Sequence, residues 1–432
     1  MSKRTAETSL VLFCASLALF LWRIGYPHGW SFDELFYIPA AHALRANAGN
    51  INPQHPPLGK LLIELSLRLF GDDLGGLRVM SAIFGAGTVA GMYWWGLAVF
   101  RRHETAWWIA LLAVVNQMLY VLARTAMLDI FMVAFMVWGM AAFCAAWASD
   151  VRPSHARWLL IVSGAMFGFA NACKWLGIVP WATALLLVVI AKIFQKTPLV
   201  RVIARETSAD PPNGDEPWIT PGLMQGVGAG TIVLAFVVAP LVAYLSTFVP
   251  LMGVKGVDAS WHGLWAAQVR IWQEHTYSGP LLHISKWYSW PLRYQPMIFY
   301  FEKASENGEY GRTVVMLGNP VVLWPAFAAG LFCLWRWVTR GSRQAFLIVL
   351  WFGALWLSWA VIPRTTTFYY YYVPAAMALM LALGYCLEHL PQRRILGIEW
   401  HWAYALLAAF FFALQLPVSS AMRIPTEWVP WQ

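Results

Sequence analysis

Apolar runs long enough to cross a membrane recur along most of this chain. A helix needs about 17 to 25 mostly apolar residues to span the hydrocarbon layer of a bilayer. Hydrophobic residues make up 59% of the 432 residues, and charged residues make up only 12%. That charged fraction is well below the level of about a quarter that is typical of soluble domains. The sequence therefore predicts an all-α polytopic membrane protein and excludes a soluble globular fold.

Eleven segments have the length and hydropathy of transmembrane helices. They are 8–24, 78–100, 106–123, 129–148, 158–173, 175–194, 223–248, 318–337, 345–361, 373–390 and 401–418. The first follows Lys3 and Arg4, as a signal peptide would, but no small-residue cleavage site comes after it. We therefore expect it to be retained as the first helix.

Loop charge predicts how these spans are oriented. Lys and Arg residues gather in cytoplasmic loops. With the N-terminus in the cytoplasm, every inside segment carries at least two cations, such as Arg101 with Arg102 and Arg393 with Arg394. An odd number of spans then places the C-terminus outside. The predicted location is the cell (inner) membrane, with the active site and the C-terminus on the outer, periplasmic side.

The sequence divides into two membrane modules joined by a linker. Residues 1–206 hold spans one to six and a first outside loop, 25–77. A Pro- and Asp-rich cytoplasmic linker follows at 207–222, and residues 223–432 hold spans seven to eleven with a long outside loop, 249–317. Within the first loop, 33–45 and 58–70 have helical apolar spacing and are predicted to lie in the membrane interface. The second loop is rich in Trp and Tyr, which favours an interfacial anchor or a wall for a headgroup or sugar.

Two adjacent carboxylates, Asp33 and Glu34, follow the first span on the outer face. Keeping ionised groups at the edge of a membrane has a desolvation cost. The pair either caps the helix that follows or carries out chemistry at the membrane surface. A further acid, Asp129, lies at the outer end of the fourth span, five residues after Arg124. These two side chains can form an ion pair.

Several cations are predicted on the same face. The run His55-Pro-Pro-Leu-Gly-Lys60 is either a rigid entry to a helix with a snorkelling lysine or an anion clamp. Arg124 and Lys174 interrupt apolar sequence between spans and are either snorkelled or turn residues, or ligands of a phosphate. Arg364 precedes four tyrosines, 369–372, which form either an aromatic belt or a path for an isoprenoid tail.

The remaining composition gives few cofactor signals. The five cysteines lie in apolar stretches without metal-ligand spacing and are predicted to be core residues. The formal charge of +9 is scattered over many loops, which favours anionic lipid headgroups over nucleic acid as the partner. No cofactor is identified. The carboxylates on the outer face could still bind a divalent cation.

Seven motifs, in order along the chain, resemble those of the protein O-mannosyltransferase family. They are Asp33-Glu34, the HPPLGK run, Arg124 with Leu128-Asp129, Lys174-Trp175, Lys286 to Leu292 (KWYSWPL), Leu317 to Pro320 (LGNP), and 363–372 (PRTTTFYYYY). That family consists of polyprenyl-phosphate-sugar-dependent membrane glycosyltransferases of the GT-C fold. The resemblance implies eleven spans, Asp33 as the general base, and Glu34 as a residue that binds or orients the acceptor. The outside loop 249–317 is too short for the MIR domain of eukaryotic relatives, so the chain resembles the shorter bacterial members.

Site chemistry and this resemblance together predict an inverting glycosyltransferase. It would move a sugar, mannose, from a polyprenyl-phosphate carrier to an acceptor hydroxyl, a protein Ser or Thr, on the outer face. The predicted substrate-binding residues are His55, Lys60, Arg124, Asp129, Lys174, Arg364 and Tyr370. One alternative is an aminoarabinose-type transferase acting on lipid A or on another lipid or polysaccharide. Another is a transporter of lipid-linked sugars, which the charge-poor midplane of the spans argues against.

Overall fold

The structure is a computed structural model. It describes residues 3–148, 150–194, 217–220, 223–224, 226–276, 285–292, 296–305, 308–364, 366–391, 393–395 and 397–429. Of the predicted linker, 207–222, only 217–220 belong to this set, so the rest of that prediction lies outside the described residues.

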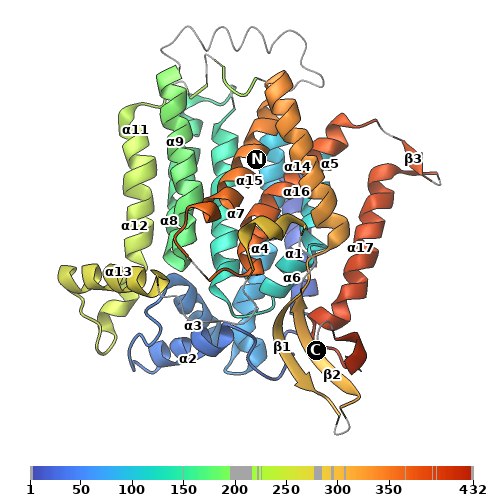
Figure 1. Cartoon of the computed structure of the whole chain (residues 1–432). Coiled ribbons are helices and arrows are strands. Elements are labelled where there is room, and N and C mark those ends of the chain that lie inside the picture. Colours follow the sequence, from blue (N-terminus) through green and yellow to red (C-terminus); the bar gives the residue numbers. More distant parts are fainter. Residues whose placement is uncertain are drawn as a thin grey trace.

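Long helices packed side by side form the body of the molecule (Figure 1). They are α1 (Lys3–Leu21), α4 (Leu74–Phe100), α7 (Leu128–Ala146), α8 (Pro153–Cys173), α9 (Ile178–Phe194), α14 (Pro320–Arg340), α15 (Arg343–Leu357), α16 (Val373–His389) and α17 (Trp400–Ser419). One further span consists of α11 (Ala229–Val233), the π-helical turn η3 (Leu234–Val238) and α12 (Ala239–Ser246). Short 3-10 turns extend four of these spans. They are η1 (Trp175–Gly177) before α9, η4 (Val249–Gly253) after α12, η6 (Ser358–Ala360) after α15 and η7 (Tyr369–Tyr372) before α16. In the described part of the chain, ten helical segments are long and apolar enough to cross a membrane, which confirms the polytopic all-α class.

The predicted span 106–123 is divided into two helices, α5 (His103–Val114) and α6 (Gln117–Leu122). Asn116 caps α6 by accepting a hydrogen bond from the Met118 amide at 3.1 Å. The next residue, Gln117, is fully buried and donates from Nε2 to the Val315 carbonyl at 2.6 Å and to the Ser419 hydroxyl at 2.7 Å. Its Oε1 accepts from the Leu317 and Gly318 amides, both at 2.9 Å. The break in the helix therefore places a fully bonded amide where three chain segments meet.

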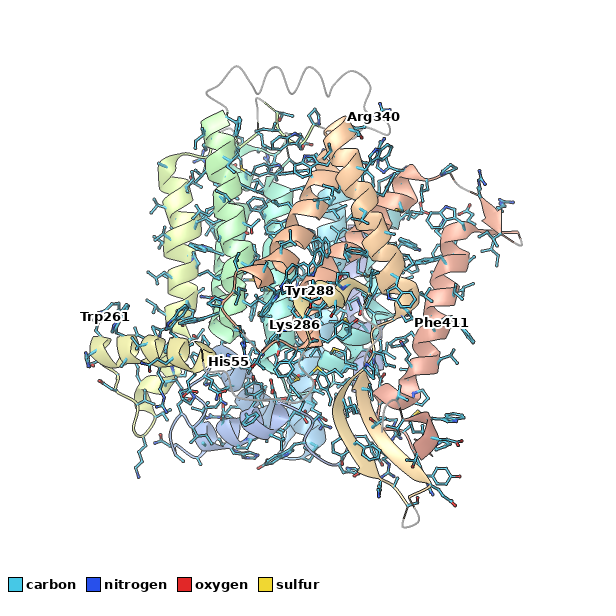
Figure 2. All side chains as sticks on the ribbon, in the orientation of Figure 1. His55, Trp261, Lys286, Tyr288, Arg340 and Phe411 are labelled. Carbon is cyan, nitrogen blue, oxygen red and sulfur yellow. The ribbon has the colours of Figure 1, made fainter. Side chains whose placement is uncertain are left out.

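One end of the bundle carries structure outside the spans (Figure 1). Helices α2 (Glu34–Arg45), α3 (Leu58–Phe70) and α13 (Trp261–Thr276) lie across this end. The helices predicted at 33–45 and 58–70 are thus confirmed. The C-terminus lies at this same end, whereas the N-terminus lies toward the other. Arg340, the last residue of α14, lies at the end opposite His55 and Trp261 (Figure 2).

A small antiparallel sheet extends from the same end. Its strands are β1 (Met297–Lys303), β2 (Tyr310–Met316) and β5 (Ile424–Pro425), in the order β1-β2-β5. The register pairs Phe301 with Thr313 and Lys303 with Gly311. A bulge between Ile298 and Tyr300 bends β1 where it approaches the helices. A second hairpin, β3 (Arg394–Ile395) with β4 (Ile398–Glu399), precedes α17.

Candidate active site

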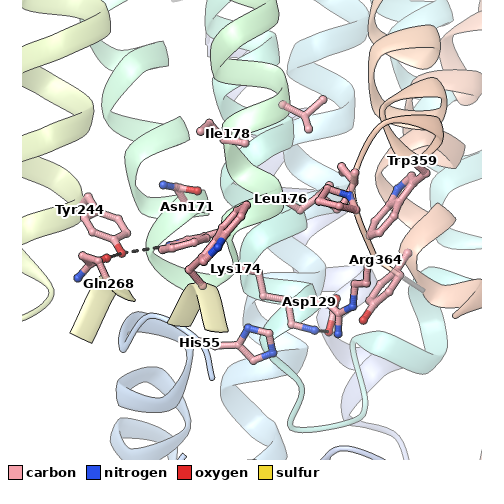
Figure 3. Close-up of a pocket in the computed structure, with 16 residues that line it drawn as sticks. His55, Asp129, Asn171, Lys174, Leu176, Ile178, Tyr244, Gln268, Trp359 and Arg364 are labelled. Carbon is pink, nitrogen blue, oxygen red and sulfur yellow. Dashed lines mark hydrogen bonds and ion pairs between the residues drawn. The ribbon is translucent and has the colours of Figure 1, made fainter. Parts of the chain in front are cut away.

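A cavity of about 540 Å³ opens between α8, α9, α12, α13 and the segment that joins η6 to η7. Its polar lining residues are His55, Asp129, Asn171, Lys174, Tyr244, Gln268, Arg364 and Tyr371. The other wall is apolar and includes Trp175, Leu176, Ile178, Trp359 and Ile362. Figure 3 shows that His55, Asp129 and Arg364 gather at the end nearer α2 and α3, while Ile178 lies further along α9. The cavity can therefore hold a molecule with an anionic end and an apolar end.

Asp33 lies beside the polar end of this cavity, where it precedes the first residue of α2. Its Oδ2 accepts hydrogen bonds from the hydroxyls of Tyr37 at 3.3 Å and Tyr370 at 3.2 Å. Burial raises the pKa of Asp33 above its ordinary value of 3.8, and the negative charge of Asp129 adds to this effect. The positive charge of Lys174 opposes the shift but does not cancel it. A carboxylate with a raised pKa is a better proton acceptor, as a general base requires.

Lys174 and Asp129 form a buried ion pair beside Asp33. The Nζ of Lys174 lies 2.7 Å from Oδ2 of Asp129. The same Nζ lies 5.3 Å from the ring centre of Tyr370 and 5.7 Å from that of Tyr371. The pairing of Asp129 with Arg124 that the sequence suggested is wrong, because Lys174 occupies the carboxylate and Arg124 points elsewhere.

Arg364 lies over the Tyr371 ring, 5.3 Å from its centre. This cation–π contact fixes the guanidinium at the cavity wall. Within the described residues, no carboxylate lies within ion-pair distance of Arg364, so its donors can meet an anionic ligand. His55 lines the same cavity, and its ring centre lies 6.0 Å from that of Tyr37. Six of the sequence-predicted residues are thus brought together: Asp33, His55, Asp129, Lys174, Arg364 and Tyr370.

Glu34 is adjacent to Asp33 but is fully buried and makes different contacts. Its two oxygens receive Nε and Nη2 of Arg78, each at 2.7 Å. They also accept from the Ser31 and Ala126 amides at 2.7 Å. Both carboxylate oxygens are therefore engaged by the protein itself. Glu34 holds α2, α4 and the loop before α7 together, a contact that fixes the position of Asp33.

Lys60 and Arg124 lie outside the cavity lining. The ammonium of Lys60 donates to Asn50 Oδ1 at 3.2 Å and to the carbonyls of Asn52 and His55. Burial lowers the pKa of Lys60 to about 7. Its ammonium group is therefore only partly charged near neutral pH and is poorly suited to neutralise a phosphate. Arg124 donates to the carbonyls of Phe20, Trp22 and Arg23, which covers the C-terminal end of α1. Both cations bind backbone oxygens in the structure.

Some site residues were not identified from the sequence. Arg78, the partner of Glu34, lies in the predicted span 78–100. An arginine within an apolar span is unusual, and this was the signal that could have identified it. Tyr37 lies within the predicted interfacial helix 33–45 but was not singled out as a site residue. A hydrogen-bond chain also links the cavity wall, because Trp175 Nε1 donates to the Tyr244 hydroxyl at 3.2 Å, which donates to Gln268 at 2.6 Å. These residues come from segments far apart in the chain, so sequence spacing could not bring them together.

We searched the described residues for side chains that could bind a metal ion together. Among the described residues, no group of three or more His, Cys, Asp or Glu side chains could hold a metal ion. The divalent cation that the sequence left open therefore has no candidate ligand set in that part of the chain.

Comparison with known proteins agrees with this geometry. A family model described as dolichyl-phosphate-mannose-protein mannosyltransferase matches residues 74–250. The polyprenol-phosphate-mannose–protein mannosyltransferase of Mycolicibacterium smegmatis is 26% identical, covering 98% of this chain and 91% of its own. The Saccharomyces cerevisiae Pmt1-Pmt2 complex bound to its sugar donor has a TM-score of 0.76 at 13% identity, covering all of this chain and 91% of that one. ArnT from Cupriavidus metallidurans, bound to undecaprenyl phosphate, has a TM-score of 0.60 at 19% identity. The match covers 95% of this chain and 65% of the ArnT chain.

The helical bundle, with an acidic residue and cations at one end beside an amphipathic cavity, has the GT-C fold of these solved membrane proteins. Within the sequence, the likeness is to protein mannosyltransferases, through the family model over residues 74–250 and the mycobacterial relative over nearly the whole chain.

Proposed function

We propose that this enzyme transfers mannose from a polyprenyl-phosphate carrier to the hydroxyl of a protein Ser or Thr. The observation that carries the proposal is the position of Asp33 beside Lys174, which together with Arg364 lines the polar end of an otherwise apolar cavity. The Mycolicibacterium smegmatis relative is named as a polyprenol-phosphate-mannose–protein mannosyltransferase, which supports the choice of mannose and of a protein acceptor.

The chemistry follows from the charges around the cavity. The acceptor oxygen attacks the anomeric carbon of the mannose while its proton passes to the carboxylate of Asp33. The bond from the anomeric carbon to the phosphate oxygen breaks, and its electron pair leaves with the polyprenyl phosphate. A phosphate is a good leaving group and needs no acid to protonate it, so a single carboxylate is sufficient. Because the attack is a single displacement, the anomeric configuration inverts.

Lys174 and Arg364 stabilise the negative charge on the departing phosphate. Arg364 reaches the phosphate directly, since it lines the cavity beside Tyr371. Lys174 supplies a second positive charge, and its pairing with Asp129 fixes its position. His55 lines the same end and can donate to the phosphate. The apolar wall of Leu176, Ile178 and Trp359 accommodates the first isoprene units.

The remaining predicted residues act through these groups. Glu34 is a positioning residue, since its bonds to Arg78 and to the Ser31 amide fix the start of α2. Lys60 holds the loop that carries His55, and Arg124 covers the end of α1. We place the site on the outer face of the cell membrane, because the cation-rich end with Arg340 lies opposite it (Figure 2).

The test is to follow label from polyprenyl-phosphate [³H]mannose with the purified enzyme in detergent. The proposal predicts label in a Ser/Thr peptide, with the opposite anomeric configuration to the donor. Label in lipid A or another lipid would instead support the lipid-acceptor alternative. A product of retained configuration would contradict the single displacement at Asp33.

A further inference from the structure

One edge of the outer sheet is open. In the described part of the chain, the strand order is β1-β2-β5, so β1 pairs with β2 on one side only. Two bonds show how β2 directs its backbone groups. The Ala421 amide donates to the Thr313 carbonyl at 3.2 Å, and the Thr426 amide donates to the Glu309 carbonyl at 2.8 Å. The backbone amides and carbonyls of the odd-numbered residues of β2 therefore face the β5 side of the sheet and not β1.

This alternation identifies the residues of β1 that face the open edge. Phe301 is opposite Thr313, and Lys303 is opposite Gly311. Since those partners point toward β5, Phe301 and Lys303 make no ladder bonds to β2 and direct their amides and carbonyls outward. The edge is closed at Phe299, whose carbonyl accepts from the Phe32 amide at 2.9 Å. The open stretch therefore runs from Phe301 to Lys303.

The closed end of this edge lies next to the proposed base. Phe32 immediately precedes Asp33, and its ring centre lies 5.4 Å from that of Phe299. The Phe299 ring also lies 6.2 Å from Tyr370, whose hydroxyl donates to Asp33. At about 3.3 Å per residue, Phe301 and Lys303 lie roughly 7 and 13 Å along the strand from Phe299. A chain paired with this edge thus reaches Asp33 within a few residues.

We propose that the open edge of β1 is the acceptor-docking site. An extended segment of the acceptor polypeptide adds a strand at Phe301 and Lys303, leaves the edge where Phe32 closes it, and presents a Ser or Thr hydroxyl to Asp33. This inference rests on the proposed function and deepens it. Backbone pairing supplies affinity without requiring particular side chains.

Donor and acceptor would then approach the base from two directions. Tyr370 lies between them, because its ring is 5.3 Å from Lys174 Nζ and 6.2 Å from the Phe299 ring. The cavity with Lys174 receives the lipid phosphate, and β1 receives the polypeptide. Such an arrangement keeps the acceptor out of the path of the lipid.

The first test uses acceptor peptides N-methylated at one position at a time. In a strand added to an edge, only alternate residues direct their amides toward the neighbouring strand. Methylation at those positions should lower kcat/KM by roughly tenfold, since a backbone hydrogen bond is lost. Methylation at the intervening positions should have little effect. A uniform loss, or no loss at any position, would overturn the proposal.

The second test changes the enzyme at the same edge. Phe301→Pro removes an outward amide, a change that edge strands tolerate, whereas Phe301→Val keeps the amide and alters only the side chain. We expect Phe301→Pro to raise the peptide KM several-fold, Phe301→Val to change it little, and both to bind polyprenyl-phosphate mannose like the wild type. Equal effects of the two variants would contradict backbone pairing.

The controls separate this inference from the proposed function. If the wild type labels peptides but the methyl scan shows no alternation, the edge proposal fails and the function stands. If no peptide is labelled and the label enters lipid, both fail. A change of oligomeric mass in Phe301→Pro would assign the edge to a second copy of this chain, which also overturns the acceptor site.

Discussion

Asp33 and Glu34 are neighbours in the sequence but have different surroundings in the structure. Asp33 receives two tyrosine hydroxyls and lies beside Lys174, whereas Glu34 receives Arg78 and two backbone amides. The sequence indicated that this acidic pair matters. It could not divide the roles, because that division depends on contacts with α4, the loop before α7 and η7, which lie tens to hundreds of residues away.

The pH dependence of the reaction should report on Asp33. The base must be deprotonated, so kcat/KM should fall as the pH drops through its raised pKa. Lys174 lowers that pKa and Asp129 raises it. Lys174→Met should therefore move the acid limb of the residual activity to higher pH, and Asp129→Asn should move it to lower pH. Shifts in the same direction, measured in pH–rate profiles, would argue against Asp33 as the titrating group.

The Glu34–Arg78 pair should be a major source of stability. Both side chains are fully buried, so removing one partner leaves an uncompensated charge at a cost of about 3–5 kcal/mol. Arg78→Met should lower the unfolding temperature in detergent strongly. The control is Glu7→Gln, which removes an exposed 3.8 Å pair with Lys3 and should change little. Similar unfolding temperatures for the two variants would contradict the structural role of Arg78.

At the scale of elements, hydropathy predicted the helices well because the bilayer fixes their length and apolar character. The segment 129–148 is α7 (Leu128–Ala146), and 58–70 is α3 (Leu58–Phe70). The division of 106–123 was not predicted, since mean hydropathy over a window does not register a break at Asn116. The β1–β2 hairpin was missed because its aromatic residues also suit an interfacial anchor, and its partner β5 is distant in sequence.

The break in that span should matter for stability. Gln117, in α6, donates two hydrogen bonds and accepts two where this helix meets α17 and the end of β2 with the residues that follow it. Gln117→Met removes the hydrogen bonds to all four partners, and each unsatisfied buried group costs about 1–3 kcal/mol. Gln117→Glu keeps the two acceptor contacts and should be less damaging. Thermal unfolding of both variants checks the order, and a Met variant as stable as the Glu variant would contradict it.

At the scale of the whole molecule, the two ends of the bundle differ in content. One end holds Asp33, the interfacial helices and the β-sheet, and the other holds Arg340 and the N-terminus (Figures 1 and 2). From the positive-inside rule, we expect the second end to face the cytoplasm. With that orientation, donor and acceptor are expected to meet outside.

Fusion reporters can test that orientation. Green fluorescent protein at the C-terminus should stay dark when that end is exported through the secretory pathway, and alkaline phosphatase at the same position should be active. The same reporters at the N-terminus should give the reverse result. Fluorescence from the C-terminal fusion would place the site in the cytoplasm and contradict the proposed topology.

The central claim is that the carboxylate of Asp33 removes the proton from the acceptor hydroxyl. Asp33→Asn keeps the size of the side chain and can still hydrogen-bond with Tyr37 and Tyr370, but it cannot accept the proton. The decisive measurement is single-turnover transfer from polyprenyl-phosphate mannose to peptide, with donor binding measured in parallel. The account predicts normal donor binding and a rate lower by roughly 10²- to 10⁴-fold. A rate close to that of the wild type, at equal expression, would contradict it.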